Sequence, residues 1–300
     1  MWRVLTLAAL GASLLILPAA SADESDEHPG LPEPAGVQYA GAIVNGLGTA
    51  EPAQQSFLVP ISVSALDVNT ILTPGSPEAY EEFNSLPGPA PCEEILAGVL
   101  FTETRVYPIS PPEAPEPFGY FPPIPVRTVA FGSIPTEAVV TVSLARTADN
   151  LPIALMAEQQ DARCRTNGRR YTDARVEGLV RVEISDVQVD GIPLQLKPGC
   201  STTELGTISM MGKGFYSADP SVDRDDVYVA TLGGLLSGTV DIPPFANCVT
   251  AQGEDVSRLF TAMVSAPGNP LQARQGNLGA CFPTGNPDLC RAPRPFDLSE

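Results

Sequence analysis

Alternation of apolar and polar residues recurs along most of this chain. It is clearest at residues 140–145 (VTVSLA) and again at 180–184 (VRVEI). Successive side chains of a β-strand point to opposite faces, so this period of two predicts strands with one buried face. About eight such segments against two short helical ones predict an all-β fold, either an antiparallel β-sandwich or a barrel, with long proline-rich loops.

The expected strands share this alternation or a short apolar run closed by turn residues. They cover residues 37–44, 57–65, 96–107, 140–145, 180–189, 205–211, 227–232 and 235–242. Asn45-Gly46 predicts a turn after the first strand, and Pro60 favours an edge position for the second. The apolar phase shifts between Ile184 and Val187, which predicts a bulge or tight corner near Asp186. The expected helices cover residues 78–86 and 253–265.

The stretch from 108 to 125 (PISPPEAPEPFGYFPPIP) is too rich in proline for a hydrogen-bonded element. It could be a docking ligand or a domain linker. We favour a long crossover lying across the sheet, because the aromatic residues Phe118, Tyr120 and Phe121 would be poorly placed on a solvated linker.

The N-terminus has the order of a secretory signal peptide. Arg3 precedes an uncharged apolar run at 4–17, and Ala20-Ser21-Ala22 offers a small-residue cleavage site. We therefore expect a signal peptide at 1–22 and a protein that is secreted, extracellular or cell-wall associated. A disordered acidic lead-in is expected at 23–36, a single β-rich domain at 37–290 and a C-terminal tail at 291–300.

Charge narrows the range of partners. The chain has 35 acidic and 17 basic residues and a formal net charge of −18. This argues against nucleic acid and against anionic lipid as partners. No apolar stretch after the leader is long enough for a membrane helix. An anionic envelope polymer or a second copy of the chain remains open as a partner, and no cofactor is expected.

Residues for common catalytic chemistry are scarce. His28 is the only histidine, and no Gly-x-Ser-x-Gly motif occurs. Lys197 and Lys213 do not lie in a Ser-x-x-Lys context. We expect a non-catalytic binding or structural protein of the cell envelope or exterior. The alternative is a glycan hydrolase that uses paired carboxylates. A deep cleft with two facing acids and stacked aromatics would favour this alternative.

Aspartates gather in the segment SADPSVDRDDVY. Asp219, Asp223, Asp225 and Asp226 offer oxygen ligands at short range, as calcium requires. The spacing matches no EF-hand, and Arg224 reduces the local charge. We favour a solvated acidic turn over a metal site.

Arginines gather in another segment. The cluster comprises Arg163, Arg165, Arg169, Arg170, Arg175 and Arg181. Guanidinium groups suit carboxylates and phosphates, so the first four are candidates for anion binding. We favour instead an exposed hairpin that turns at Asn167-Gly168. The acids available there to pair with its arginines are Asp161, Asp173, Glu177 and Glu183.

Six cysteines follow the export signal, namely Cys92, Cys164, Cys200, Cys248, Cys281 and Cys290. In an oxidising compartment they predict three disulfides, with fifteen connectivities open. Metal binding is a poor alternative, because no Cys-x-x-Cys pair occurs and no histidine completes a zinc site. Cys164 and Cys200 flank the strand run 176–196, so a turn inside that run would bring them together.

The last part of the chain resembles a group of uncharacterised secreted actinobacterial proteins. The likeness is carried by VDIPPFANC (240–248), GEDVSRLFTAMVSAPGNP (253–270), the pair Gln275-Gly276 and Cys281, with weaker matches at CRTNG (164–168) and VDGIPLQLKPGC (189–200). It covers residues 164–281. The resemblance implies secretion and β structure and carries no catalytic residues.

The same resemblance bears on the disulfides. Cys248 and Cys281 recur together in the group, which implies that they pair. Cys92 and Cys290 do not occur in the group and would then pair with each other. The chain also departs from the group by having Ala266 where the group has glycine. The competing pair is Cys281–Cys290, which lie closest in sequence.

The leader gives a direct test. Secreted material should begin with Asp23-Glu24-Ser25, because the small residues before Asp23 fit the cleavage site of signal peptidase. N-terminal sequencing checks this. Recovery of secreted protein that still begins at Met1 would contradict it.

Overall fold

The computed structural model describes residues 28–72, 100–130, 134–163, 169–217, 219, 221–223, 226–283 and 286–298. Its strands are β1 (Tyr39–Ala50), β2 (Gln55–Leu72), β3 (Leu100–Pro108), β4 (Ile124–Ala130), β5 (Ile134–Leu144), β6 (Leu155–Arg163), β7 (Arg169–Tyr171), β8 (Ala174–Val189), β9 (Ile192–Pro193), β10 (Ser201–Thr202), β11 (Gly206–Gly212), β12 (Tyr228–Val229), β13 (Gly233–Ile242), β14 (Phe245–Ala246) and β15 (Ala266–Gln275). The helices are η1 (Glu51–Ala53), α2 (Ser257–Val264) and η3 (Pro287–Leu289).

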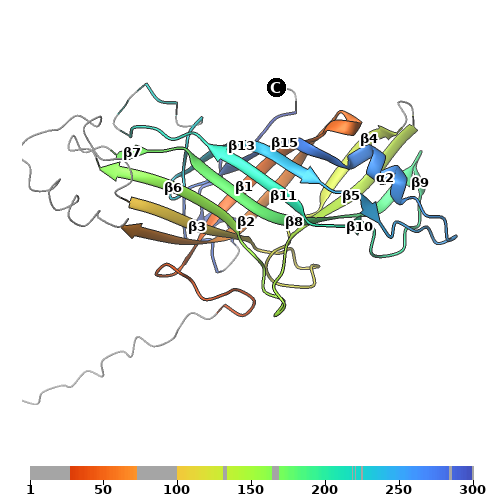
Figure 1. Cartoon of the computed structure of the whole chain (residues 1–300), viewed down its shortest axis with the longest axis horizontal. Helices are drawn as coiled ribbons and strands as arrows, with labels where there is room; N and C mark the ends of the chain where they lie inside the picture. Colours follow the sequence, from red (N-terminus) through yellow and green to blue (C-terminus); the bar gives the residue numbers. More distant parts are fainter. Residues whose placement is uncertain are drawn as a thin grey trace, which may run out of the picture.

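The strands form one antiparallel sheet that closes into a barrel (Figure 1). Eight of them follow one another around the ring in the order β8, β11, β13, β15, β1, β2, β3 and β6. The ring closes because β6 also pairs with β8. The prediction of an all-β fold is confirmed, and of the two architectures left open the chain adopts the barrel.

The long strand β8 pairs with two different strands along one of its edges. Its first part pairs with β6, and its later part pairs with β5. Strand β5 in turn pairs with β4, which contacts β2. The hairpin β4–β5 therefore extends the wall at one end of the barrel, the end that also carries η1 and α2 (Figure 1).

Burial along β8 follows the alternation of its sequence. Val176, Val180 and Val182 are buried, whereas Arg175 and Glu177 are exposed. The apolar face points into the barrel and the charged face points outward, as the period of two requires. Beyond Ile184, buried residues pack with Cys200 and Cys248 in a second apolar cluster at the α2 end.

The sheet is irregular at two positions, of which the sequence predicted the one near Asp186. Asp186 has a φ of 51°, and the register between β5 and β8 shifts beside it, which confirms the bulge. Pro60 lies at a second bulge, where the register of β2 against β1 shifts. Strand β3 pairs with β2 only from Ser64 onward, so β2 has one hydrogen-bonded neighbour at Pro60 and tolerates a residue without an N–H.

The turn predicted at Asn45-Gly46 is wrong. Strand β1 runs through this dipeptide to Ala50, because β15 and β2 pair with it on both sides. Gly46 serves close packing instead, since a Cβ there would press on Val59 and on the Gln272 carbonyl. The chain reverses after η1, where Gln54 adopts a left-handed conformation with a φ of 52°.

The helix expected at 253–265 is confirmed as α2, which is shorter than the pattern suggested. The helix expected at 78–86 lies outside the described residues. The strand expected at 227–232 shrinks to the two residues of β12, because this segment turns into the barrel. Among the described residues, no helix combines the length and the apolar character needed to cross a membrane.

The proline-rich stretch is a crossover between β3 and β4, as favoured above. Its aromatic residues anchor it to the wall. Phe118 contacts the Phe282 ring, and Tyr120 forms a bridge with Ser143. Phe121 reaches the interior of the barrel.

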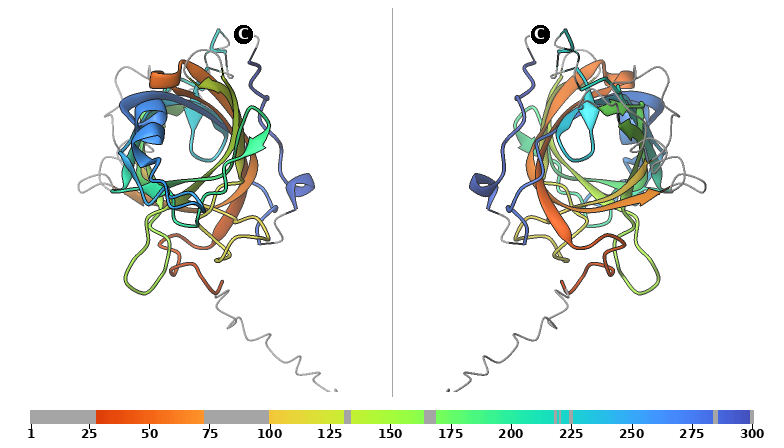
Figure 2. Two further views of the ribbon diagram at one scale, coloured as in Figure 1. Left: turned by 90° about the vertical axis from the view of Figure 1, so that its right-hand side faces the viewer. Right: turned by 90° about the vertical axis from the view of Figure 1, so that its left-hand side faces the viewer.

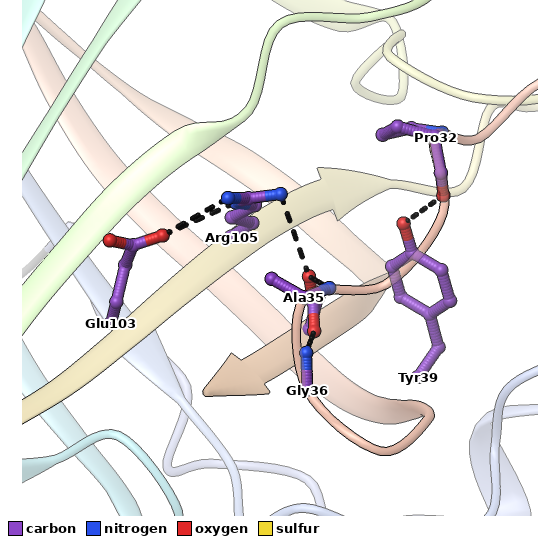
Figure 3. A network of polar contacts seen from close by, with 7 residues as sticks. Pro32, Ala35, Gly36, Tyr39, Glu103 and Arg105 are labelled. Carbon is purple, nitrogen blue, oxygen red and sulfur yellow. Dashed lines mark hydrogen bonds and ion pairs between the residues drawn. The ribbon is translucent and has the colours of Figure 1, made fainter. Parts of the chain in front are cut away.

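Residues before β1 are held by a buried carboxylate. Asp67 is fully buried, and its two oxygens accept hydrogen bonds from the N–H groups of Ala35 (2.7 Å) and Gly36 (2.8 Å). Figure 3 shows Arg105 between Glu103 and the loop that carries these two residues. The last residues of the segment expected as a disordered lead-in are therefore bound to β2.

The cysteine pairing differs from the three pairs expected and includes the competing pair, Cys281–Cys290. Cys200 is bonded to Cys248, and Cys281 is bonded to Cys290. Cys164–Cys200, Cys248–Cys281 and Cys92–Cys290 are therefore all wrong. β10 and β14 are hydrogen-bonded neighbours, which brings Cys200 and Cys248 together. The run 176–196 reverses only near its end, where β9 pairs with β8, so the residue after Cys200 lies beside Glu183 rather than at the start of the run. Cys92 and Cys164 lie outside the described residues.

Removal of each disulfide should cost more stability the longer the loop that it closes, with a logarithmic dependence on loop length. The separations are 48 residues for Cys200–Cys248 and 9 for Cys281–Cys290. Replacing the first pair by alanine should lower the free energy of unfolding by about 4 kcal/mol, and replacing the second by about 3 kcal/mol. Urea denaturation measures both losses. A larger loss for the second pair would contradict this order.

Candidate functional site

The barrel encloses an apolar cavity of about 200 Å³. Inward-facing side chains of nearly every wall strand line it, among them Phe57, Val142, Val182 and Leu271. Several of them are only half-buried although they face the interior, because the space before them is unfilled. An eight-stranded barrel is just wide enough either to fill with side chains or to hold one small ligand.

Small residues recur at paired positions of the barrel wall. Two rows of paired residues cross β1, β15 and β13, and each contains residues with little or no side chain. The rows are Gly46, Ala273 and Leu236, and Gly48, Leu271 and Gly238. A strand interior normally avoids glycine, since it contributes no packing. At these glycines a neighbouring residue occupies the space, since a Cβ at Gly48 would overlap the Phe57 ring and one at Gly238 would overlap the Ser209 carbonyl.

One end of the barrel is plugged by the chain itself. Residues 227–230, which include β12, are all buried. Figure 2 looks along the barrel from both ends and shows this segment, in cyan, inside the ring of strands. The side chain of Tyr228 lines the cavity and forms its floor.

Two glutamines from opposite parts of the wall hold this plug. Gln159 donates to the Tyr228 carbonyl at 3.0 Å, and Gln275 donates to the Ala230 carbonyl at 2.8 Å. The Tyr228 hydroxyl donates to Gln275 Oε1 at 3.0 Å. Burial raises the pKa of the Tyr228 phenol well above its ordinary value. Backbone groups in a barrel interior need such partners wherever the pairing of β12 with β13 leaves them unsatisfied.

The other end is bordered by short elements. η1 contacts α2, β15 and β4 at this rim. Ala53 and Gln55 line the cavity from the start of β2, Thr128 from β4, and Met263 and Val264 from α2. All five are half-buried.

Helix α2 is fixed to the rim by local hydrogen bonds. Thr261 accepts from the Phe245 N–H at 2.9 Å, and Ser257 accepts from the Cys248 N–H at 3.1 Å. Since Cys248 is bonded to Cys200, the helix is anchored beside the disulfide. Its C-terminal residues remain directed to the cavity.

The predicted anion-binding arginines lie on the hairpin β6–β7. The register pairs Arg163 with Arg169 and Ala162 with Arg170. Arg165 lies outside the described residues, as does the turn. The two strands confirm the hairpin, which lies away from the α2 rim (Figure 1). Anion binding there stays a prediction.

The wider arginine cluster is partly engaged by the barrel wall. Arg175 pairs with Glu177 on the same strand, and Arg181 donates to the Thr202 carbonyl at 2.9 Å. The Arg175 pair matches the expected pairing with local acids. Exposed pairs of this kind add little stability, so they serve mainly to keep the outer face polar.

The aspartate segment is only partly described. Asp219 accepts hydrogen bonds from the N–H and hydroxyl of Ser221, which lower the pKa of its carboxyl. Asp225 lies outside the described residues. Within the described part of the chain, no three acidic, histidine or cysteine side chains gather as a metal site. The calcium hypothesis gains no support from this loop.

The sequence reasoning missed the residues that shape the cavity. The roles of Gln159 and Tyr228 could not be predicted from the sequence, because single polar residues in apolar strands occur for many reasons. Gln275-Gly276 was noted only as part of a resemblance. The position of Gln275 beside Gly233-Gly234 in the fold could not be predicted from the order of the residues in the chain.

The Tyr228 hydroxyl should matter for stability. Tyr228→Phe leaves the Gln275 Oε1 acceptor buried without its donor, so we expect a loss of about 1–3 kcal/mol in the free energy of unfolding. Tyr120→Phe is the matched control, since this half-buried ring stacks on Arg146 and should change the free energy by less than about 0.5 kcal/mol. Urea denaturation measures both. Equal losses would contradict the assigned role.

Comparisons with protein-family models, curated proteins and solved structures found no match to this chain. The resemblance to secreted actinobacterial proteins therefore stays a prediction. Function has to be argued from the cavity and its lining.

Proposed function

We propose that this protein is a secreted, non-catalytic binding protein that holds a small apolar molecule inside its barrel. The observation that carries the proposal is the unfilled apolar cavity of about 200 Å³. An apolar cavity of roughly 150 Å³ stays dry and binds benzene. A cavity of this size and lining therefore favours occupation by an apolar ligand.

The chemistry of the lining supports binding over catalysis. No carboxylate, lysine, arginine or histidine belongs to the described residues that line the cavity. His28 packs edge-on against the Phe282 ring, 4.5 Å between centroids, and is not among the lining residues. The two facing acids that would favour a glycan hydrolase are thus missing from the described lining.

Export is supported by the leader and by the disulfides. Two bridges occur among the described residues, and disulfides persist in oxidising compartments. A binding protein outside the cell needs no energy source or cofactor to hold an apolar molecule, since burial of apolar surface supplies the affinity.

Filling the cavity should weaken binding. Val142 points into the barrel, so Val142→Phe should reduce the affinity for the uncharged apolar dye N-phenylnaphthylamine by about tenfold or more. Dye fluorescence in a titration measures the affinity. Thr141→Phe on the outward face of the same strand is the matched control and should change it by less than about twofold.

Thermal denaturation of both variants shows whether they fold. A folded wild-type protein that binds neither the dye nor any apolar molecule released by organic extraction would overturn the proposed function. Equal affinity of the two variants would place the dye outside the barrel.

A further inference from the structure

We infer that the cavity takes a single hydrocarbon chain, which enters between α2 and η1 and ends against Tyr228, leaving the polar part of the ligand at the rim. This inference rests on the proposed function and adds the ligand class and its direction.

The end at Tyr228 is unsuited to entry. A ligand passing there would displace residues 227–230, which are buried and hydrogen-bonded to both Gln159 and Gln275. The segment is also paired with β13 and donates from the Tyr228 N–H to the Lys213 carbonyl at 3.0 Å. Breaking several buried hydrogen bonds at once is costly, so this end acts as a floor.

The opposite rim suits entry. Its lining comes from η1, from the end of β4 and from α2, which are short; η1 contacts both of the others without pairing with them as a strand. Met263 and Val264 close the space from the side, and Met side chains adapt easily to different shapes. Displacing these two side chains breaks none of the sheet pairing.

The shape of the cavity favours a chain. Its lining follows β2 from Gln55 to Ser64, a length of about 30 Å along the strand or ~23 Å along the barrel axis. A volume of about 200 Å³ spread over such a length is narrow. A slim, flexible hydrocarbon fits it better than a compact ring system.

The polar groups set the direction. Gln55 and Thr128 line the rim, and no described lining residue is charged. At the floor, the Tyr228 hydroxyl and both Gln275 side-chain groups are already used within the protein. Asn45, Ser62 and Ser64 also line the deeper part, but they are buried there. A head group keeps its contact with water only at the rim, so the rim is the favoured place for it.

Native methionines provide reporters along this path. Met263 lies at the rim, and Met210 lies deeper, in the apolar cluster with Tyr228 and Leu236. Met211 follows Met210 on the same strand but faces outward and is exposed. Methyl spectra of the protein labelled with ¹³C-methyl methionine separate these sites, and Met→Leu variants assign them.

The probe is the methyl ester of stearic acid with a nitroxide either beside the ester or near the chain terminus. The ester avoids charge repulsion by an acidic protein of net charge −18. The label beside the ester should broaden the Met263 signal more than the Met210 signal, and the terminal label should do the reverse. Met211 should keep its intensity with both.

Each outcome decides between the claims. The reverse order of broadening would place entry at the Tyr228 end. Equal broadening of Met210 and Met263 by both labels would exclude a fixed direction. Either result overturns this inference, while the proposed function stands. Absence of broadening at Met210 and Met263, together with failure to bind the apolar dye, would overturn the proposed function itself.

Discussion

Three residue pairs between β6 and β8 close the sheet into a barrel and so create its interior. Met156, Ala157 and Glu158 pair with Glu177, Val176 and Arg175, and without them the sheet would remain open along two edges. Gly178 lies next to this seam, where a Cβ would overlap the Leu155 side chain. A larger residue there would push the two strands apart. Closure satisfies both edges and turns one apolar sheet face into an enclosed space.

The two ends of this space differ in how they are built. At one end the backbone enters the barrel and is satisfied by Gln159 and Gln275, so the floor consists of main chain held by hydrogen bonds. At the other end side chains of separate short elements meet at a rim. A floor of hydrogen-bonded backbone is rigid, whereas a rim of side-chain contacts opens at smaller cost. The asymmetry gives the cavity one entrance.

Much of the wall could be predicted from the sequence, since alternation fixes which side chains of β8 face inward, and the phase shift fixes the bulge at Asp186. The choice between sandwich and barrel could not, because it depends on whether β6 meets β8, a pairing that no local pattern records. The prediction of the disulfides failed for a related reason. Cys200 and Cys248 meet through the pairing of β10 with β14, which are only two residues long and carry too little sequence to be recognised. The cavity could not be predicted, because it depends on how well the side chains of many distant strands fill the closed barrel, which no local pattern records.

The pairing of β1 with β15 has a consequence for the order of assembly. Val44 lies opposite Gln275, so the first strand of the barrel cannot gain its second neighbour until nearly the whole chain is present. Until then, β1 and β2 form a hairpin with one unpaired edge and an uncovered apolar face. Folds dominated by such distant pairings form slowly, and exposed edges invite association with other chains. In a chain that emerges with its N-terminus first, the second edge of β1 therefore stays unpaired until β15 is available.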